Sequence, residues 1–343
     1  MRAVVVEAPD RLAIHSVPEP SVGPYQVLTR TLSCGLCGTD KRIVSGHFYR
    51  RSFPGILGHE AVGRVVERGG RVRNLAVGDL VLRTTAVYPN DQLGGFSSLL
   101  GGLAEYGIAT DWEALRQDQP GCALSPWWLS QQKLPTDFDA MNGGMFITLK
   151  EILSWVAQLR IQAGKSVAVV GLGPVGLTLI RVCKLLGASP VVAIGRKQQR
   201  LAMAEELGAD VVVDNSEFAR EGLEDQLATR FDFILDSAGD LALLERLPGL
   251  LNDRGQLAIY SVPEEQRMVL DWSWGGNVPR NWSLVFRVPQ EHDHHQQALD
   301  YWRLGLFDPG RFMSHAYQLE DMQEAWNVLT SGEAVKIVIR VNS

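Results

Sequence analysis

The spacing of apolar and polar residues changes along the chain. Before residue 148, short apolar or alternating runs between Pro- and Gly-marked turns predict strands at 3–6, 12–15 and 26–31. After it, apolar runs alternate with helical periodicity, which predicts a helix at 148–160, a strand at 167–170, a helix at 177–186 and a strand at 191–194. The chain therefore predicts a β-rich part followed by an α/β part with a parallel sheet.

A glycine pattern joins the strand at 167–170 to the helix that follows it. Residues 171–176 read GLGPVG, the G-x-G-x-x-G spacing of dinucleotide-binding loops. Gly171 permits a tight turn, Gly173 lets the backbone approach a pyrophosphate, and Gly176 lets the helix pack on the strand. The alternative is an ordinary structural turn, but the strands on both sides and the periodic helix favour cofactor binding.

The end of the next strand bears on the choice of nicotinamide cofactor. An acidic residue about 20 residues after the glycines usually holds the ribose 2′-hydroxyl of NAD. Gly195 occupies that position here, followed by Arg196 and Lys197. Two cations and no carboxylate favour NADP, with NAD still possible, because both cations have an alternative interpretation as solvated surface charges.

Length and composition exclude several classes of protein. The chain has 343 residues, more than one hydrophobic core normally supports, so two domains are expected. A net charge of −6 argues against nucleic acid as a partner and does not suggest a basic membrane-binding surface. The apolar runs are shorter than the roughly 20 residues that cross a bilayer. The N-terminus lacks the layout of a signal peptide, and four cysteines fit a reducing cytoplasm better than a disulfide scaffold.

A candidate metal site lies in the β-rich part. Cys34 and Cys37 have C-x-x-C spacing, but a zinc ribbon needs a second such pair and a thioredoxin-like motif needs a βαβ setting. In the competing interpretation Cys37 joins His59 and Glu60. A thiolate, an imidazole and a carboxylate, with one position left for water or substrate, are the composition of a catalytic zinc site. Taken alone, His59 would more often be a structural histidine.

These motifs and their order resemble the zinc-type medium-chain dehydrogenase/reductase (alcohol dehydrogenase) superfamily, and within it the sorbitol, threonine and glucose dehydrogenase-like branch. The matching segments are CGTD at 37–40, GHEAVGRVV at 58–66, VGDLV at 77–81, GLGPVG at 171–176, YQLEDMQEAW at 317–326 and KIVIR at 336–340. The resemblance implies an α/β protein with a Rossmann doubly wound parallel sheet and a GroES-like β-rich catalytic domain, with the active site between the two. The implied domains are 1–147 (catalytic), 148–287 (NAD(P)-binding) and 288–343 (return to the catalytic domain).

The resemblance also assigns roles to residues. Cys37 and His59 match the family's zinc ligands, and Glu60 matches a carboxylate that binds the metal directly in some members and indirectly in others. Thr39 matches the hydroxyl that begins a proton relay, and Asp40 matches an acidic position that is usually structural. The expected catalytic residues are Cys37, Thr39, His59 and Glu60. The expected cofactor-binding residues are Gly171, Gly173, Pro174, Val175, Gly176, Gly195, Arg196, Lys197, Arg200 and Lys336.

Three departures from the family pattern change this picture. Residues 82–121 contain no cysteine, so we expect one catalytic zinc and no structural zinc. The family's third zinc ligand falls near 145–147, where no ligand stands, and Glu151 lies inside the expected helix. Zinc would then be held by Cys37, His59 and Glu60 alone, or weakly, or not at all. The relay histidine aligns with Arg42, which does not release a proton at neutral pH, so Thr39 would need water or cofactor hydroxyls.

Three further segments allow two interpretations each. Trp112, Trp127 and Trp128 could stack on a sugar ring, although packing beneath a loop is the simpler alternative. The segment 280–286 resembles the family's edge strand that pairs across a dimer. The run 291–295, EHDHH, suggests a metal cluster, but a solvated first helical turn explains it more simply.

The sequence thus predicts a zinc-type NAD(P)-dependent dehydrogenase in a homodimer or homotetramer. It would oxidise a secondary hydroxyl of a polyol, sugar or amino-alcohol, or reduce the ketone. An alternative is a metal-free NADPH-dependent carbonyl or enone reductase of the same fold. A more distant alternative is a non-catalytic nucleotide-binding protein, in which loss of Cys37 or His59 would be expected.

Overall fold

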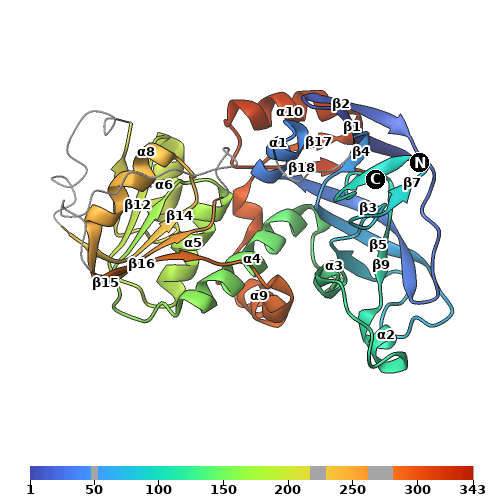
Figure 1. Cartoon of the computed structure of the whole chain (residues 1–343), viewed down its shortest axis with the longest axis horizontal. Helices are drawn as coiled ribbons and strands as arrows, with labels where there is room; N and C mark the ends of the chain where they lie inside the picture. The colour runs from blue at the N-terminus through green and yellow to red at the C-terminus, as the bar shows by residue number, and fades with distance from the viewer. Residues whose placement is uncertain (48–52, 217–228, 262–280, 343) are drawn as a thin grey trace. The chain divides into compact units, whose positions relative to one another are not determined.

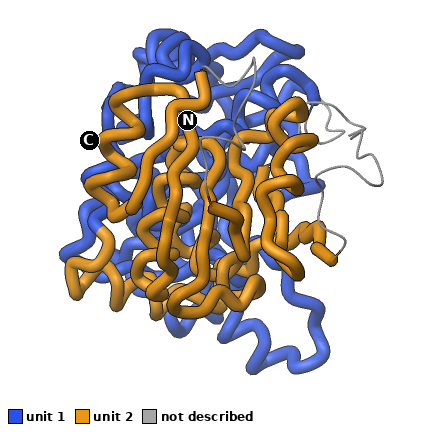
Figure 2. Tube along the Cα trace, turned by 90° about the vertical axis from the view of Figure 1, so that its left-hand side faces the viewer, with its two compact units in different colours: residues 1–147, 308–343 blue, residues 148–307 orange. Residues whose placement is uncertain are grey.

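The computed structural model describes residues 1–47, 53–216, 229–261 and 281–342, and the chain divides into two compact units (Figure 1, Figure 2). Unit 1 contains Met1–Ile147 and Asp308–Ser343, and unit 2 contains Thr148–Phe307. The chain leaves unit 1 within helix α4 (Gly143–Leu159). It returns at Asp308, whereas the family resemblance suggested a return near residue 288.

Contacts within unit 2 explain this later boundary. The backbone N–H of Gln290 donates to Ser154 Oγ at 3.0 Å, and Gln158 Nε2 donates to the carbonyl of Val288 at 3.2 Å. Arg181 Nε donates to the carbonyl of Leu306 at 2.7 Å. Residues 288–307 are therefore bonded to helices of unit 2.

Unit 2 is built on a parallel sheet of six strands, seen as orange strands running side by side in Figure 2. The strands, in spatial order, are β13 (Val211–Asp214), β12 (Val191–Gly195), β11 (Val167–Val170), β14 (Phe231–Asp236), β15 (Leu251–Ile259) and β16 (Trp282–Phe286). From β11 the chain proceeds to β12 and β13 on one side and to β14, β15 and β16 on the other. This reversal beside β11 is the point at which doubly wound sheets bind ligands.

Helices cover this sheet because their apolar positions recur with helical spacing. They are α4, α5 (Pro174–Leu185), α6 (Gln198–Glu206), α8 (Leu241–Arg246) with the 3-10 turn η2 (Leu247–Leu250), and η3 (Glu291–His294) leading into α9 (His295–Arg303). The sheet core includes Val170, Ile194, Ile234 and Leu257, all almost fully buried. The strands and helices predicted for 148–194 are confirmed, with ends shifted by a few residues.

Unit 1 contains two β-sheets. One has the order β2 (Arg11–Ser16), β1 (Arg2–Ala8), β4 (Gly55–Leu57), β8 (Phe96–Leu99), β7 (Gln92–Leu93). The other has the order β10 (Lys133–Leu134), β6 (Leu80–Leu82), β5 (Glu60–Arg68), β3 (Gln26–Leu36), β18 (Lys336–Arg340), β17 (Met313–Gln318), and β9 (Tyr106–Thr110) also pairs with β3. The helical segments are α1 (Gly38–Val44), α2 (Trp112–Asp118), α3 (Pro126–Ser130), η1 (Ala140–Asn142), η4 (Pro309–Phe312), η5 (Leu319–Asp321) and α10 (Met322–Ser331).

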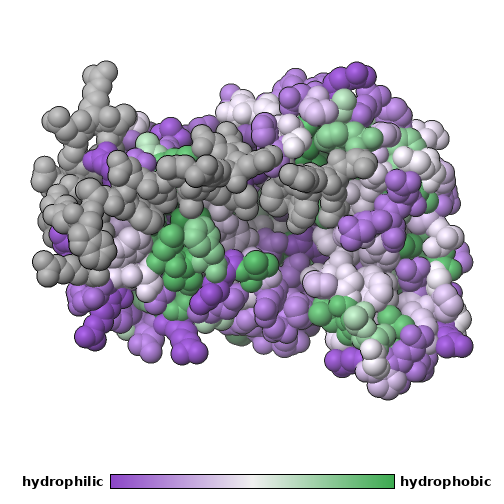
Figure 3. Space-filling view, in the orientation of Figure 1, coloured by the Kyte–Doolittle hydropathy of each residue, from purple (hydrophilic) through white to green (hydrophobic). Residues whose placement is uncertain are grey.

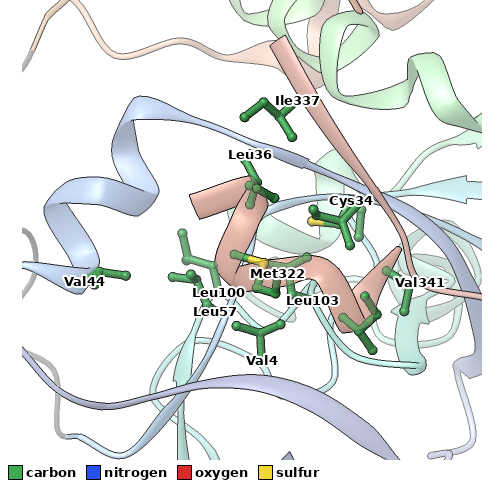
Figure 4. Packing of buried hydrophobic residues seen from close by; sticks show 14 of the residues in the cluster. Val4, Cys34, Leu36, Val44, Leu57, Leu100, Leu103, Met322, Ile337 and Val341 are labelled. Atoms are coloured by element: carbon green, nitrogen blue, oxygen red, sulfur yellow. The ribbon is translucent and has the colours of Figure 1, made fainter. Parts of the chain in front are cut away.

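The core of unit 1 joins distant parts of the chain. Figure 4 shows Met322 of α10 beside Leu100, Leu103 and Val4, with Cys34 and Leu36 of β3 nearby. Cys34 is fully buried there, and burial raises the pKa of its thiol well above the usual range. Cys34 is therefore a core residue, unlike Cys37.

The tryptophans of α2 and α3 are used in packing. Trp127 packs against the apolar core of unit 1, and Trp128 meets Tyr88 edge-on with ring centroids 6.1 Å apart. The Arg116 guanidinium lies 5.2 Å from the centre of the Trp112 ring. The structure thus favours packing over sugar stacking for this segment.

Candidate metal centre and cofactor loop

The candidate metal centre forms where β3 ends and β5 begins. Cys37 follows β3 and precedes the first turn of α1, and Gly35 pairs with Glu60 in the antiparallel β3–β5 ladder. The turn before His59 needs glycine, because Gly58 has φ +102° and an added Cβ would lie 2.7 Å from the backbone nitrogen of Leu103. The fold thereby brings Cys37 beside His59 and Glu60.

The three side chains are close enough to share one metal ion. One ligand atom from each of Cys37, His59 and Glu60 lies within 4.8 Å of the others. His59 and Glu60 are buried, with 8% and 3% of their surface exposed, and Cys37 is half-buried. Throughout the described ranges, this is the one group of three or more Cys, His, Asp or Glu side chains arranged in this way. Sulfur, nitrogen and oxygen donors of this kind suit zinc.

Asp40 orients the imidazole of His59. Its Oδ1 lies 3.1 Å from His59 Nδ1, and its Oδ2 accepts a hydrogen bond of 2.9 Å from the backbone N–H of Cys37. Burial alone would lower the pKa of His59, but the charge of Asp40 and hydrogen bonds to Asp40 and Cys37 raise it well above the usual range. With Nδ1 directed at Asp40, Nε2 is the ring nitrogen that could bind a metal. The sequence analysis assigned Asp40 only a structural position and missed this contact.

Glu60 is paired with Lys336, which the sequence analysis had assigned to the cofactor. Lys336 Nζ donates to Glu60 Oε1 at 2.6 Å and lies 2.6 Å from Oε2, where the hydrogen-bond geometry is not met. Burial would lower the pKa of Lys336, but the charges of Glu60, Cys37 and Asp40 raise it above the usual value. The placement of Lys336 thus differs from the expectation: its ammonium is buried against the carboxylate of the candidate metal centre.

The start of α4, where the family's third zinc ligand was expected to be missing, contains no metal-binding side chain at 145–147. Met145, Phe146 and Ile147 are fully buried apolar residues. Glu151 accepts a hydrogen bond of 3.0 Å from the Tyr260 hydroxyl, and both residues belong to unit 2. Glu60 is therefore the carboxylate that joins Cys37 and His59.

Two further residues adjoin the centre. Thr39 Oγ1 lies 3.8 Å from Cys37 Sγ, which places a hydroxyl beside the expected ligand. Arg83, almost fully buried, donates from Nη1 to the carbonyl of His59 at 2.8 Å and supports the backbone there.

The glycine loop of unit 2 has the geometry of a dinucleotide-binding turn. Gly171 has φ +88°, and a Cβ on Gly176 would lie 1.8 Å from the carbonyl oxygen of Gly171. Gly173 precedes α5, and a Cβ there would meet no atom within 4 Å. Pro174 and Val175 form the first turn of α5. The loop thus leaves open space in front of a helix N-terminus, where anions bind.

The end of β12 contains the residues expected to select the cofactor. A Cβ on Gly195 would lie 2.6 Å from Leu172 Cδ1, so this position is closed to a carboxylate side chain in this conformation. Arg196 and Lys197 are exposed, whereas Arg200 is half-buried and burial lowers its pKa.

The structure adds a carboxylate that the sequence analysis did not anticipate. Asp214 ends β13 and pairs in register with Gly195. It accepts hydrogen bonds from Gln198 Nε2 at 2.8 Å and from the N–H of Ser216 at 2.9 Å, which lower its pKa. The region around Gly195 therefore contains a carboxylate as well as the two cations, Arg196 and Lys197, that the sequence indicated.

The remaining histidine-rich segment does not form a metal cluster in the structure. Residues 291–295 span η3 and the start of α9, and His294 Nδ1 lies 2.8 Å from Gln297 Oε1.

Among the described helices, none is both long and apolar enough to cross a membrane.

Comparison with known proteins agrees with this fold and these motifs. The sequence model of the "Alcohol dehydrogenase GroES-like domain" matches residues 23–118, and that of the "Zinc-binding dehydrogenase" family matches residues 174–273. Sorbitol dehydrogenase of Halalkalibacterium halodurans is 27% identical, with 95% of each chain covered. Glucose 1-dehydrogenase of Thermoproteus tenax is 29% identical over the full length of both chains. The solved alcohol dehydrogenase TADH from Thermus sp. ATN1 shares the fold with a TM-score of 0.80, at 24% identity and full coverage of both chains.

A GroES-like unit and a doubly wound unit in one chain, with a Cys/His/Glu centre and a glycine loop, define the class as a nicotinamide-dependent oxidoreductase. The chain belongs to the zinc-type medium-chain dehydrogenase/reductase superfamily, that of the alcohol dehydrogenases.

Proposed function

We propose that the chain is a zinc-dependent dehydrogenase that uses NADP and oxidises a secondary hydroxyl of a polyol, sugar or amino-alcohol, or reduces the corresponding ketone. The observation that carries this proposal is the group formed by Cys37, His59 and Glu60, whose ligand atoms lie within 4.8 Å of one another. The orientation of His59 by Asp40 supports the same conclusion, because metal-binding histidines usually donate their second nitrogen to such a partner.

Each residue of the centre has a chemical role in this proposal. Zinc held there would act as a Lewis acid that lowers the pKa of the substrate hydroxyl. Thr39 is the hydroxyl beside Cys37 and would accept the substrate's proton, passing it to water or to cofactor hydroxyls because Arg42 does not release one. Asp40 holds the tautomer of His59 in which Nε2 carries no proton when the metal is bound.

The glycine loop supports binding of the dinucleotide. Gly173 leaves room for the pyrophosphate, and the N–H groups of the first turn of α5 would bind it. The nicotinamide ring of a bound cofactor would accept the hydride from the carbinol carbon of the substrate.

NADP is favoured over NAD because Arg196 and Lys197 follow β12 and can attract a 2′-phosphate. The pairing of Asp214 with Gln198 and Ser216 directs that carboxylate's hydrogen bonds to residues of the protein. Arg196 and Lys197 directly follow Gly195, the position at which NAD-binding proteins usually carry the acidic residue for the ribose.

The proposed substrate class is supported by relatives that cover the chain over nearly its whole length. Sorbitol and glucose are the substrates in the names of the two relatives described above, and both carry secondary hydroxyls flanked by further hydroxyls. We extend this class, and not an individual compound, to the present chain.

We also propose a homodimer or homotetramer working in the cytoplasm, where its four free cysteines would stay reduced. Among the described residues, β16 is the last strand of the unit 2 sheet, and it exposes apolar side chains: Leu284, Phe286 and the following Val288 are 37%, 51% and 79% exposed. In Figure 3 a green area lies over this part of unit 2. Pairing of two copies at β16 would cover both the edge and the apolar surface.

The decisive experiment measures zinc per chain, reduction of ketoses with NADPH and oxidation of polyols with NADP⁺ in the purified protein, its Cys37→Ser variant and its Cys34→Ala control. About one zinc per chain, lost with turnover in Cys37→Ser and kept in Cys34→Ala, is the expected result. Full activity in Cys37→Ser would exclude the metal mechanism. Tight NADPH binding and enone reduction without zinc would indicate the metal-free reductase instead.

A further inference from the structure

Glu60 and Lys336 stand on opposite sides of strand β3. Glu60 begins β5, which pairs with β3 through Gly35, and Lys336 begins β18, which pairs with β3 on its other edge, Val338 opposite Gly35. Neighbouring strands are about 4.8 Å apart, so the two side chains must reach across the middle strand to meet. The glycine at 35 is what lets them do so.

Two glycines enclose the Glu60 carboxylate. A Cβ on Gly35 would lie 2.1 Å from Glu60 Oε2, and a Cβ on Gly144 would lie 2.6 Å from the same oxygen. Any other residue at either position would displace the carboxylate. Gly144 also precedes the apolar stretch 145–147, where a ligand was expected, so the space beside α4 is filled by Glu60 in place of a side chain from that helix.

The ammonium of Lys336 is the partner of this carboxylate inside the protein. Lys336 is 2% exposed and its Nζ lies 2.6 Å from each carboxylate oxygen, with a hydrogen bond to Oε1. Glu60 Oε2 is buried and has no hydrogen-bond partner among the described residues. Oε2 is thus the oxygen that can turn to a metal while Oε1 keeps its bond to Lys336.

We infer that Lys336 is an internal cation that shares Glu60 with the metal and thereby weakens metal binding at this centre. This inference rests on the proposed zinc site. A divalent ion held by Oε2 would be close to the ammonium bonded to Oε1, and the two cations would repel each other in a buried region where water screens little. Without the ammonium, Glu60 is a buried carboxylate whose remaining available cation is the metal.

The test is a zinc titration against a chromophoric chelator with the full-length protein and four variants: Lys336→Met, Lys336→Arg, Glu60→Gln and the double variant Lys336→Met/Glu60→Gln. Lys336→Met should bind zinc at least about tenfold more tightly, equivalent to 1.4 kcal/mol. Lys336→Arg keeps the charge and should stay near the wild-type affinity. Glu60→Gln should bind more weakly.

A second readout separates this role from simple support of the fold. Lys336→Met leaves an uncompensated carboxylate, so its melting temperature without zinc should fall and the increase upon zinc addition should exceed that of the wild type. If this variant folds only with zinc, the double variant, which has no buried charge at either position, supplies the comparison. Its zinc affinity should equal that of Glu60→Gln.

Equal or weaker zinc binding by Lys336→Met overturns the inference, and so does tightening that persists in the Glu60→Gln background. These outcomes are distinguishable from failure of the proposed function. If zinc binding is lost in Cys37→Ser but does not respond to Lys336, only the role of Lys336 is wrong. If wild type and Cys37→Ser bind zinc equally, the metal centre itself is wrong.

Discussion

The candidate metal centre of unit 1 is formed by ionisable side chains, whereas the glycine loop of unit 2 is formed by the backbone. His59, Glu60, Asp40 and Lys336 are each at most 8% exposed, and they form two pairs, His59 with Asp40 and Glu60 with Lys336. The loop at 171–176 has its shape because Gly171 and Gly176 lack side chains. The first site should therefore fail when a side chain is removed, and the second when one is added.

The largest effect is expected at Asp40, because its carboxylate contacts both His59 and the backbone of Cys37. Asp40→Ala should weaken zinc binding by about 10- to 100-fold, the range seen when partners of metal-binding histidines are removed. Chelator competition measures this. Asp139→Ala, which removes only the N-cap of η1, is the control in the same unit. Equal zinc affinity in the two variants would contradict the role of Asp40.

Replacing a loop glycine by alanine, which adds one methyl group, tests the glycine loop of unit 2. Gly176→Ala should destabilise unit 2 by about 1–3 kcal/mol, because the new Cβ would lie 1.8 Å from the Gly171 oxygen. Gly173→Ala meets no atom within 4 Å and should change the unfolding free energy by less than about 1 kcal/mol, yet still weaken NADPH binding. Thermal unfolding and NADPH titration of both variants give the answer. Unchanged NADPH affinity in Gly173→Ala would place the pyrophosphate elsewhere.

Cofactor binding in unit 2 is also expected to depend on charged side chains near the end of β12, unlike the glycine loop itself. Arg196→Ala should weaken NADPH binding about tenfold, or about 1.4 kcal/mol, and leave NADH binding almost unchanged. Asp214→Asn should shift the preference the opposite way, toward tighter NADPH binding, because its carboxylate stands beside Gly195. Titration of both cofactors measures this. A loss of NADH and NADPH affinity in equal measure in Arg196→Ala would show that the arginine does not distinguish them.

The smallest effect concerns Asp111, a carboxylate of unit 1 that belongs to neither group of site residues. Burial would raise the pKa of Asp111, but bonds from Asn74, Arg73 and Ala114 lower it below the usual value. A lowered folded-state pKa means that the stabilisation is present above the unfolded value of about 3.9 and is lost as pH falls through the folded value.

Asp111→Asn should accordingly cost about 0.5–1.5 kcal/mol of unfolding free energy at pH 7. The difference from the wild type should narrow upon acidification, as urea unfolding at several pH values would show. Asp232→Asn in unit 2 is the matched variant. Asp232 is only half-buried and bonded to Ser166 and Lys165, so its effect should be smaller.

The same contrast explains what the sequence could predict. The glycine loop occupies six consecutive residues, and Cys37, His59 and Glu60 belong to two compact motifs, so pattern and resemblance found them. Lys336 and Glu60 are separated by 276 positions, and their contact depends on the pairing of β18 with β3. Asp214 reaches Gly195 only through the register of two parallel strands. The local periodicity of a sequence does not predict the register between distant strands. The contacts of Lys336 with Glu60 and of Asp214 with Gly195 were missed for this reason.

The position of β18 has a consequence for protein synthesis. This strand lies between β3 and β17 and carries the ammonium that neutralises Glu60, yet the ribosome makes it only after the whole of unit 2. Until then β3 exposes one backbone edge, and Glu60 lacks its cation. Unit 2 is continuous and can fold as it emerges, whereas unit 1 must wait, which makes the nascent chain dependent on protection of that edge from aggregation.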